Sequence, residues 1–313
     1  MTNWRLVADV GGSNVRFARS RASHLLADRR SYPLTAHASF YDALTAFLNE
    51  TGGMEGCASA VVDVAGPVDA GTVKLTNADW LIEADRVGAV LGGVPACVIN
   101  DLQAVALALP YLRDHELAPI GGARRKSGAA QTMVAVNVGT GFGAAAAISV
   151  GDGWIANPGE PGHMTLGACN SAEADILGGL PTVEEALSGR GIRNIYAAVA
   201  RQRGRAPDAA LSAAEIFARS GEDEIAAETL RLSAMLLGRV SGDIALAGAA
   251  WGGVYLCGSV ASGLINAGGG KYFRKPFEDK GPMTRIMENV YSGLIACDDV
   301  ALIGLSYMPL GGG

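Results

Sequence analysis

The sequence predicts a two-domain α/β protein with mixed sheets, and three observations support this. The chain has 313 residues, which is enough for two domains at the usual size of roughly 100–200 residues each. Short apolar runs with strand character alternate with longer runs of helical character. The 43 glycines occur in small clusters between the apolar runs, where tight turns require them. Strands that alternate with helices are typical of α/β folds.

The first predicted element is a β-hairpin. The apolar run at 5–10 ends at Gly11-Gly12, and apolar and basic residues alternate over 15–19, which is the strand period. Further along, we predict strands at 58–64, 71–75 and 97–99, and helices at 40–49 and 102–112.

The hairpin pattern returns 128 residues later, between Asp9 and Asn137. A strand at 133–138 leads into a glycine turn at 139–143 and a second strand at 144–150. This repeat suggests a duplicated domain in which each half presents one phosphate-facing hairpin, although coincidence in a glycine-rich chain is the alternative. The remainder is predicted as helices at 183–187, 192–202, 212–220, 222–246 and from 302, with strands at 253–257 and 293–297.

Composition excludes several classes of protein. Hydrophobic residues make up 49% and charged residues 18%, so the chain can bury a large core. The net charge of −6 argues against nucleic acid or an anionic membrane as a partner. The basic cluster of Arg124, Arg125 and Lys126 is interpreted as a solvated loop. No signal peptide and no run of about 20 apolar residues is visible, so we expect a cytoplasmic protein.

The five cysteines are odd in number and lack CxxC spacing. They support neither a zinc ribbon nor a disulfide framework. We therefore expect buried free thiols in a reducing cytoplasm.

Glycine turns after strands suggest phosphate binding, because backbone N–H groups can approach an anion there. The segment 121–127 ends in Lys-Ser but has arginine where a P-loop requires its second glycine. The segment 139–143 is GxGxG between two strands, whereas a dinucleotide fingerprint is GxGxxG between a strand and a helix. The protein-kinase motifs are also missing from the sequence.

The turns at 9–16, 137–143 and 252–259 resemble those of the sugar-kinase, Hsp70 and actin superfamily. Within it, the chain resembles a bacterial glucokinase over nearly its whole length. The resemblance implies a two-domain actin-like ATPase (ribonuclease H-like) fold, with a cleft between a smaller α/β domain (1–108 plus 297–313) and a larger α+β domain (109–296). It also implies ATP, Mg²⁺, glucose and a homodimer. The segments that carry it are 9–16, 75–77 with Trp80, 99–101, 139–143, 158–163, 184–189 and 277–281.

Asp101 is the candidate general base. A sugar hydroxyl is a poor nucleophile, so a carboxylate must accept its proton as the new bond forms. Asp101 follows a predicted strand, and an aspartate there can equally cap the next helix. The local sequence supports the general-base role and the helix-cap role equally, and the family resemblance favours the general-base role.

Carboxylates and amides read sugar hydroxyls through paired hydrogen bonds. By resemblance, the sugar contacts are Asn100, Asp101, Glu160, His163 and Glu184. Asn77 is a weaker candidate, since asparagine in a turn often bonds only its own backbone.

The nucleotide contacts also follow from the resemblance. Asp9 is expected to orient Mg²⁺ through water, because Mg²⁺ keeps several waters. The expected phosphate contacts are Gly11, Gly12, Ser13 and Asn14 in the first turn and Gly139, Thr140 and Gly141 in the second, with Gly258 beside the adenosine. Arg16 either adds positive charge or is a strand-face residue.

Three departures from the family pattern leave the sugar open. Ser13 stands in place of threonine, Pro161 in place of glycine, and Cys257-Gly258-Ser259 in place of a small residue followed by two glycines. We therefore expect glucose phosphorylation, with mannose, fructose or N-acetylglucosamine as alternative acceptors. A non-catalytic sugar sensor on the same fold is the other alternative.

Overall fold

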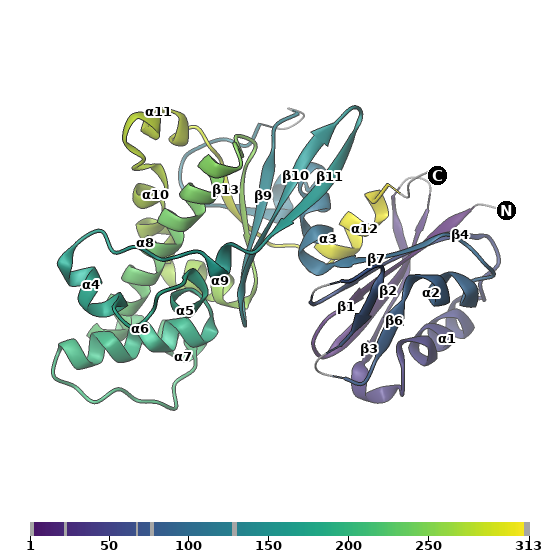
Figure 1. Ribbon diagram of the computed structural model, residues 1–313, viewed down its shortest axis with the longest axis horizontal. Coiled ribbons are helices and arrows are strands. Elements are labelled where there is room, and N and C mark those ends of the chain that lie inside the picture. The colour runs from purple at the N-terminus through teal and green to yellow at the C-terminus, as the bar shows by residue number, and fades with distance from the viewer. Residues whose placement is uncertain (1–2, 22–23, 67, 76–77, 127–129, 310–313) are drawn as a thin grey trace. The chain divides into compact units, whose positions relative to one another are not determined.

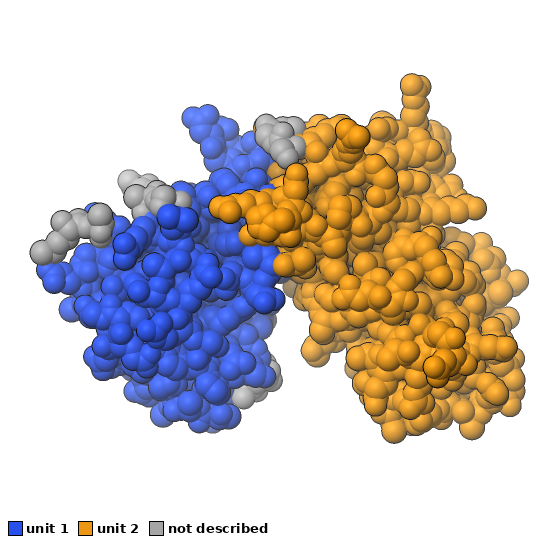
Figure 2. Space-filling view, turned by 180° about the vertical axis from the view of Figure 1, so that it is seen from behind, with its two compact units in different colours: residues 1–112, 149–158, 297–313 blue, residues 113–148, 159–296 orange. Residues whose placement is uncertain are grey.

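The computed structural model describes residues 3–21, 24–66, 68–75, 78–126 and 130–309. The chain divides into two compact units, shown in blue and orange in Figure 2. Unit 1 contains residues 1–112, 149–158 and 297–313, and unit 2 contains residues 113–148 and 159–296. The boundaries expected from the sequence differ from these units at 109–112 and 149–158. Each unit has its own hydrophobic core.

Unit 1 is built on a five-stranded sheet in the order β3-β2-β1-β4-β7. β1 pairs antiparallel with β2 and parallel with β4, and β4 pairs parallel with β7. Between β4 and β7 in the sequence, β5 and β6 pair antiparallel as a separate two-stranded sheet. The strands are β1 (Trp4–Val10), β2 (Asn14–Arg21), β3 (Leu26–Pro33), β4 (Cys57–Val64), β5 (Thr72–Lys74), β6 (Leu81–Glu83) and β7 (Ala96–Asn100).

Alternation along β1 sends its side chains to opposite faces of the sheet. Leu6, Ala8 and Val10 belong to the core that includes helix α1 (Phe40–Thr51) and helix α2 (Ala84–Val90). The odd-numbered side chains therefore point to the other face, where α3 (Asp101–Ala108) packs against α12 (Val300–Tyr307). Figure 1 shows these two helix pairs on either side of the strands.

The C-terminal helix is fastened to the first strand by Arg5. Its guanidinium donates to the carbonyl oxygens of Leu305, Ser306 and Met308 at 3.2, 3.1 and 2.7 Å. These carbonyls lie at the end of α12, where no further turn of helix satisfies them. Gly304 allows α12 to approach α3, because a Cβ there would lie 1.8 Å from the carbonyl oxygen of Ala104.

Unit 2 repeats the same strand plan. β9 pairs antiparallel with β10 and parallel with β12, and β12 pairs parallel with β13. The sheet has the order β11-β10-β9-β12-β13-β8, and its residues 149–158, at the end of β10 and in β11, are counted with unit 1. Both predicted hairpins are thus confirmed. The strands are β8 (Leu117–Pro119), β9 (Met133–Val138), β10 (Phe142–Val150), β11 (Gly153–Gly159), β12 (Gly253–Cys257) and β13 (Ser292–Ile295).

The rest of unit 2 is mainly helical, as predicted beyond residue 175. The longest helix, α8 (Glu224–Ala247), packs closely on α10 (Gly270–Glu278) because Gly238 and Gly242 lie against the carbonyl oxygens of Phe273 and Phe277. The other helices are α4 (Ser171–Leu177), α5 (Val183–Ala186), α6 (Gly189–Gln202), α7 (Ala213–Ala218), α9 (Ser259–Leu264) and α11 (Thr284–Met287).

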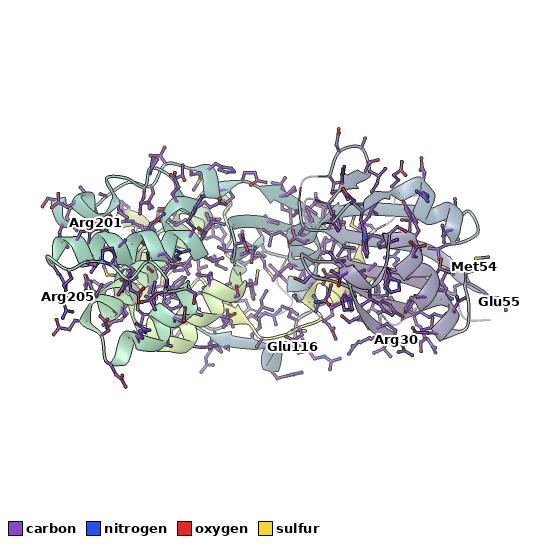
Figure 3. The ribbon with its side chains drawn as sticks, turned by 90° about the horizontal axis from the view of Figure 1, so that it is seen from below. Arg30, Met54, Glu55, Glu116, Arg201 and Arg205 are labelled. Carbon is purple, nitrogen blue, oxygen red and sulfur yellow. The ribbon has the colours of Figure 1, made fainter. Side chains whose placement is uncertain are left out.

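Two minor expectations need correction. The side chain of Arg125 is 10% exposed rather than solvated, because it lies over the ring of Tyr255 and donates to its hydroxyl at 3.2 Å. All five cysteines are free, but none is fully buried: Cys169 is exposed, and the other four are partly buried. The exposed Arg201 and Arg205, by contrast, extend outward from the end of α6 (Figure 3). Within the described part of the chain, no helix combines the length and apolar character needed to cross a bilayer.

Candidate active site

A row of ionisable side chains crosses the unit 1 sheet on the face covered by α3 and α12. Asp9 in β1 is paired in register with Arg16 in β2 and with Asp63 in β4. Arg16 donates to the Asp9 carboxylate and to the carbonyl oxygen of Asp298. Neighbours in register on one face are the pairs that interact in a sheet, so these three side chains form one electrostatic unit.

Asp63 is a site residue that sequence reasoning missed. Its side chain is 0% exposed, and among the described residues neither oxygen accepts a hydrogen bond. Burial raises the pKa of Asp63 well above its usual range, and the charges of Asp9 and Asp101 raise it further. The signal was a single aspartate within the apolar run at 57–64.

Asn100 and Asp101 lie where β7 ends and α3 begins. Asn100 is the N-cap: its Oδ1 accepts from the amide of Leu102 at 3.0 Å, and its Nδ2 donates to the carbonyl of Gly66 at 3.1 Å. The Asp101 Oδ1 also accepts from the Leu102 amide, at 2.8 Å. Asp101 therefore does assist the helix N-terminus, and its other carboxylate oxygen is not engaged by that bond.

The pKa of Asp101 is raised. Burial is the largest cause and the charge of Asp9 adds to it, while hydrogen bonds from the Leu102 amide and Asn100 act in the opposite direction. A carboxylate with a raised pKa is a stronger base at neutral pH than an ordinary aspartate. Asp9 thus influences Asp101 through space, although the two lie on different elements.

The first glycine turn joins β1 to β2. The amide of Gly11 donates to the carbonyl of Asn14 at 2.9 Å, and the amide of Leu34 donates to the carbonyl of Ser13 at 2.9 Å. Gly12, Ser13 and Asn14 are exposed. A closed turn with an exposed, side-chain-poor tip can bring backbone N–H groups close to an anion.

The second glycine turn, in unit 2, is held from two sides. Within it, the Gly139 amide donates to the carbonyl of Gly141 at 3.0 Å, and the Gly189 amide donates to the carbonyl of Gly139 at 2.9 Å. The amide of Phe142 donates to Glu184 Oε2 at 3.0 Å. Thr140 remains exposed at the tip. No sequence motif indicates the hydrogen bond between the Phe142 amide and Glu184.

Glu160 is the N-cap residue of a single 3₁₀ turn, Pro161–His163, and His163 is the last residue of that turn. The His163 amide donates to the Glu160 carbonyl at 3.1 Å, and both residues are exposed. Gly162 packs against the second glycine turn, because a Cβ there would lie 2.4 Å from the carbonyl oxygen of Phe142 and 3.4 Å from Glu184 Cβ. Unit 2 therefore brings the turn at 160–163, Glu184 and the turn at 139–141 together.

Gly258 ends β12 beside the same hairpin. Its φ is +92°, and a Cβ there would lie 2.3 Å from Asn137 Oδ1 and 2.5 Å from the Val138 carbonyl oxygen. Both the conformation and the space thus require glycine. The remaining predicted contact, Asn77, lies outside the described residues.

The donor set fits Mg²⁺ held through water. Within the described ranges, no three His, Cys, Asp or Glu side chains are arranged to hold a metal ion. Asp9 is 6% exposed and already ion-paired with Arg16. Mg²⁺ usually keeps several waters and binds one or two carboxylates together with substrate phosphates. Asp9 is therefore suited to outer-sphere coordination, in which it hydrogen-bonds to the water ligands of an ion that is bound mainly by the nucleotide.

The chain is similar to known proteins over nearly its whole length. A model of the glucokinase family matches residues 6–310. The glucokinase of Chelativorans sp. (strain BNC1) is 37% identical over 317 residues, covering 96% of this chain and 90% of its own. The glucokinase of Nitrobacter hamburgensis is 34% identical over 324 residues, covering 99% and 98%.

Solved structures give the same result. Glucokinase from an Antarctic psychrotroph superposes with a TM-score of 0.88 at 29% identity, covering 98% of both chains. A ROK family glucokinase from Streptomyces griseus in complex with glucose and AMPPNP has a TM-score of 0.60 at 19% identity, covering 97% of this chain and 98% of its own. These likenesses and the mixed sheets confirm the expected actin-like ATPase fold.

Proposed function

The chain belongs to the glucokinase family, and from this premise we propose that it transfers the γ-phosphoryl group of ATP to the 6-hydroxyl of glucose, with Asp101 as general base. The observation that carries the proposal is the Asp101 carboxyl, which stands where β7 meets α3 with a raised pKa. A base works best when its pKa approaches the operating pH.

Asp101 accepts the proton of the sugar hydroxyl as its oxygen attacks the γ-phosphorus, while the bond from the γ-phosphorus to the β,γ-bridging oxygen breaks and ADP leaves. Its Oδ1 is fixed by the Leu102 amide, so the carboxylate is oriented before substrate binds. Phosphoryl transfer depends mainly on positioning and on electrostatic stabilisation. A pre-oriented base satisfies the first of these.

The two glycine turns supply the contacts to the phosphates. Gly11, Gly12, Ser13 and Asn14 present backbone and hydroxyl donors from unit 1, and Gly139, Thr140 and Gly141 do so from unit 2. Gly258 contacts the adenosine. Mg²⁺ bound with ATP would neutralise phosphate charge, and Asp9, which Arg16 holds in place, would be the residue that orients its water ligands.

The sugar is recognised by Asn100, Glu160, His163 and Glu184 together with Asp101. Asn100 is partly committed to its neighbours through Leu102 and Gly66, so it orients the hydroxyl beside Asp101 with the hydrogen-bonding capacity that remains. The exposed Glu160 and His163 stand on one short turn, which is suited to reading adjacent hydroxyls.

The test is ADP release with Mg-ATP and a panel of glucose, mannose, fructose and N-acetylglucosamine, for wild type and Asp101→Ala. We expect turnover on glucose that collapses in the variant. Turnover confined to another hexose would keep the mechanism and change the substrate that we assign. Pro161, at the start of the 3₁₀ turn, would then be the first residue to mutate. Sugar binding without turnover on any acceptor would favour the sensor.

We also propose a cytoplasmic homodimer. The five free cysteines suit a reducing compartment, and the homodimer follows from the family resemblance. Light scattering at several protein concentrations tests the assembly: a monomeric mass throughout would exclude it.

A further inference from the structure

Glu184 lies between two parts of the unit 2 site. It stands in the short helix α5, and Oε2 accepts from the Phe142 amide at 3.0 Å. Phe142 follows the second glycine turn directly, so one carboxylate oxygen of Glu184 is committed to the backbone that ends this turn. A carboxylate has two oxygens and several acceptor positions, which leaves Oε1 for another donor.

The surrounding contacts hold Glu184 in this position. Thr182 and Glu185 form a capping box at the start of α5. The Val183 amide donates to the Met164 carbonyl at 3.0 Å, which fastens α5 to the segment that follows His163. The helix that carries Glu184 is therefore bonded to the chain beside the proposed sugar contacts.

Space around the turn is as restricted as its hydrogen bonding. A Cβ at Gly141 would lie 2.8 Å from Glu184 Oε2. Gly162 lies against both the Phe142 carbonyl oxygen and Glu184 Cβ. At Gly141 and Gly162 there is thus no room for even a methyl group between the glycine turn, Glu184 and the turn that carries His163, so a shift of one is transmitted to the others.

We infer that Glu184 is a positioning residue for the phosphate turn at 139–142 as well as a sugar contact. This inference rests on the proposed function, because it takes the turn as the ATP site and Oε1 as the sugar contact. Glucose that engages Oε1 fixes the carboxylate, and Oε2 then fixes the Phe142 amide. Binding of glucose and nucleotide is consequently coupled, and by linkage each strengthens the other.

The matched pair Glu184→Gln and Glu184→Ala separates the two roles. Glutamine keeps a carbonyl oxygen that can accept the Phe142 N–H, whereas alanine keeps no acceptor. Both variants are expected to raise the KM for glucose. Only Glu184→Ala is expected to raise the KM for ATP as well, by about tenfold for a buried amide left without its partner.

Glu160→Gln serves as the control for a loss of sugar affinity alone. Glu160 is exposed and precedes the 3₁₀ turn at Pro161–His163, and the acceptor of the Phe142 amide is Glu184 rather than Glu160. This variant is expected to raise the KM for glucose and to leave the KM for ATP unchanged. It shows how a sugar contact behaves when it is not linked to the phosphate turn.

A readout without any ligand completes the test. Hydrogen exchange of the Phe142 amide is expected to be slow in wild type and Glu184→Gln, and about tenfold faster in Glu184→Ala. Gly141→Ala is expected to accelerate it too, because the added methyl group displaces Oε2 without removing the carboxylate. Circular dichroism verifies that each variant is folded.

The outcomes distinguish the inference from the proposed function. If Glu184→Ala behaves like Glu160→Gln, with an unchanged KM for ATP and unchanged exchange at Phe142, the positioning role is overturned. If wild type fails to phosphorylate glucose, the proposed function fails, and the exchange measurements still decide whether Glu184 holds the turn.

Discussion

The hairpins β1–β2 and β9–β10 follow one backbone plan and carry different chemistry. In both, the first strand pairs antiparallel with the second and parallel with a later strand. In unit 1, the row across these three strands is Arg16, Asp9 and Asp63. Every position in that row is ionisable, and Asp101 lies within its electrostatic reach.

In unit 2, the corresponding row is Gly143, Asn137 and Cys257. No side chain there carries a full charge at neutral pH, and the turns around it are glycine-rich. Gly258 allows close approach to Asn137. The first hairpin is therefore suited to tuning a proton acceptor, and the second to presenting backbone N–H groups to an anion. The difference shows that side chains at matched register positions, rather than the topology, divide the chemistry between the units.

The assignment of proton transfer to unit 1 is tested most strongly by Asp101→Asn. Asparagine retains an oxygen for the Leu102 amide but cannot accept a proton, so kcat is expected to fall by about 10²–10⁴-fold. Steady-state ADP release measures kcat and KM, and the melting temperature should stay unchanged because the cap survives. A fall in kcat smaller than about tenfold would contradict a general-base role.

The packing of the unit 2 hairpin is tested by Gly258→Ala against Gly268→Ala. Both glycines have φ near +90°, but a Cβ at Gly258 meets Asn137 Oδ1 whereas one at Gly268 has nothing within 4 Å. The conformational cost is also higher at Gly258, whose ψ of 154° lies in a region essentially restricted to glycine, whereas Gly268 has ψ 13° near the left-handed helical region, so Gly258→Ala should lose at least about 1–3 kcal/mol more stability. Thermal unfolding measures this, and only Gly258→Ala should raise the KM for ATP. Equal losses would show that the close approach is unimportant.

Asn137→Asp places an aspartate in the second hairpin at the position that Asp9 occupies in the first. The second hairpin has no counterpart of Arg16, which pairs with Asp9. Because Gly143 stands opposite, the new carboxylate has no cation across the strand, and a like charge within about 10 Å of the phosphates costs roughly 1–2 kcal/mol. The KM for ATP is expected to rise about tenfold, while Asn289→Asp, an exposed change of equal charge on unit 2, should leave it unaltered. An unaffected KM would place the phosphates away from this row.

The smallest expected effect comes from Asp63→Asn. Since the pKa of Asp63 is raised in the folded state, the native protein holds this proton more tightly than the unfolded chain. Wild-type stability therefore falls as pH rises from the ordinary aspartate pKa toward the folded value. Asparagine removes this loss, so the melting temperature should exceed that of wild type by about 2–4 °C near pH 8 and by least near pH 4. A gap in melting temperature that stays constant with pH would contradict a protonated Asp63.

Much of the fold could be predicted because the apolar runs are strongly periodic. The predicted hairpin strands match β1, β2, β9 and β10 within a few residues. β3 was missed because its residues 26–33 are mostly exposed and polar, which leaves no alternating pattern. The start of α3 was predicted from Asp101, whereas the capping box uses Asn100 and Gln103.

The candidate site was predictable where it depends on side chains in order along the chain. Asp9, Asp101 and the glycine turns stand out in the sequence. The role of the Phe142 amide could not be predicted from the sequence. Every residue other than proline has an N–H group, and only the packing of the chain determines which of them donates to Glu184. The effect of Asp63 on its neighbours depends on strand register, since residues 9 and 63 become partners only when β1 and β4 align.

The Arg5 contacts with the end of α12 set an order of events during synthesis. The first carbonyl that Arg5 bonds lies 300 residues downstream, so at about 5–20 residues per second the ribosome delivers it about 15–60 s after Arg5. All residues of unit 2 are translated before that point, because its last segment ends at 296. The nascent chain can therefore complete its second unit before α12, which contacts β1, has been synthesised.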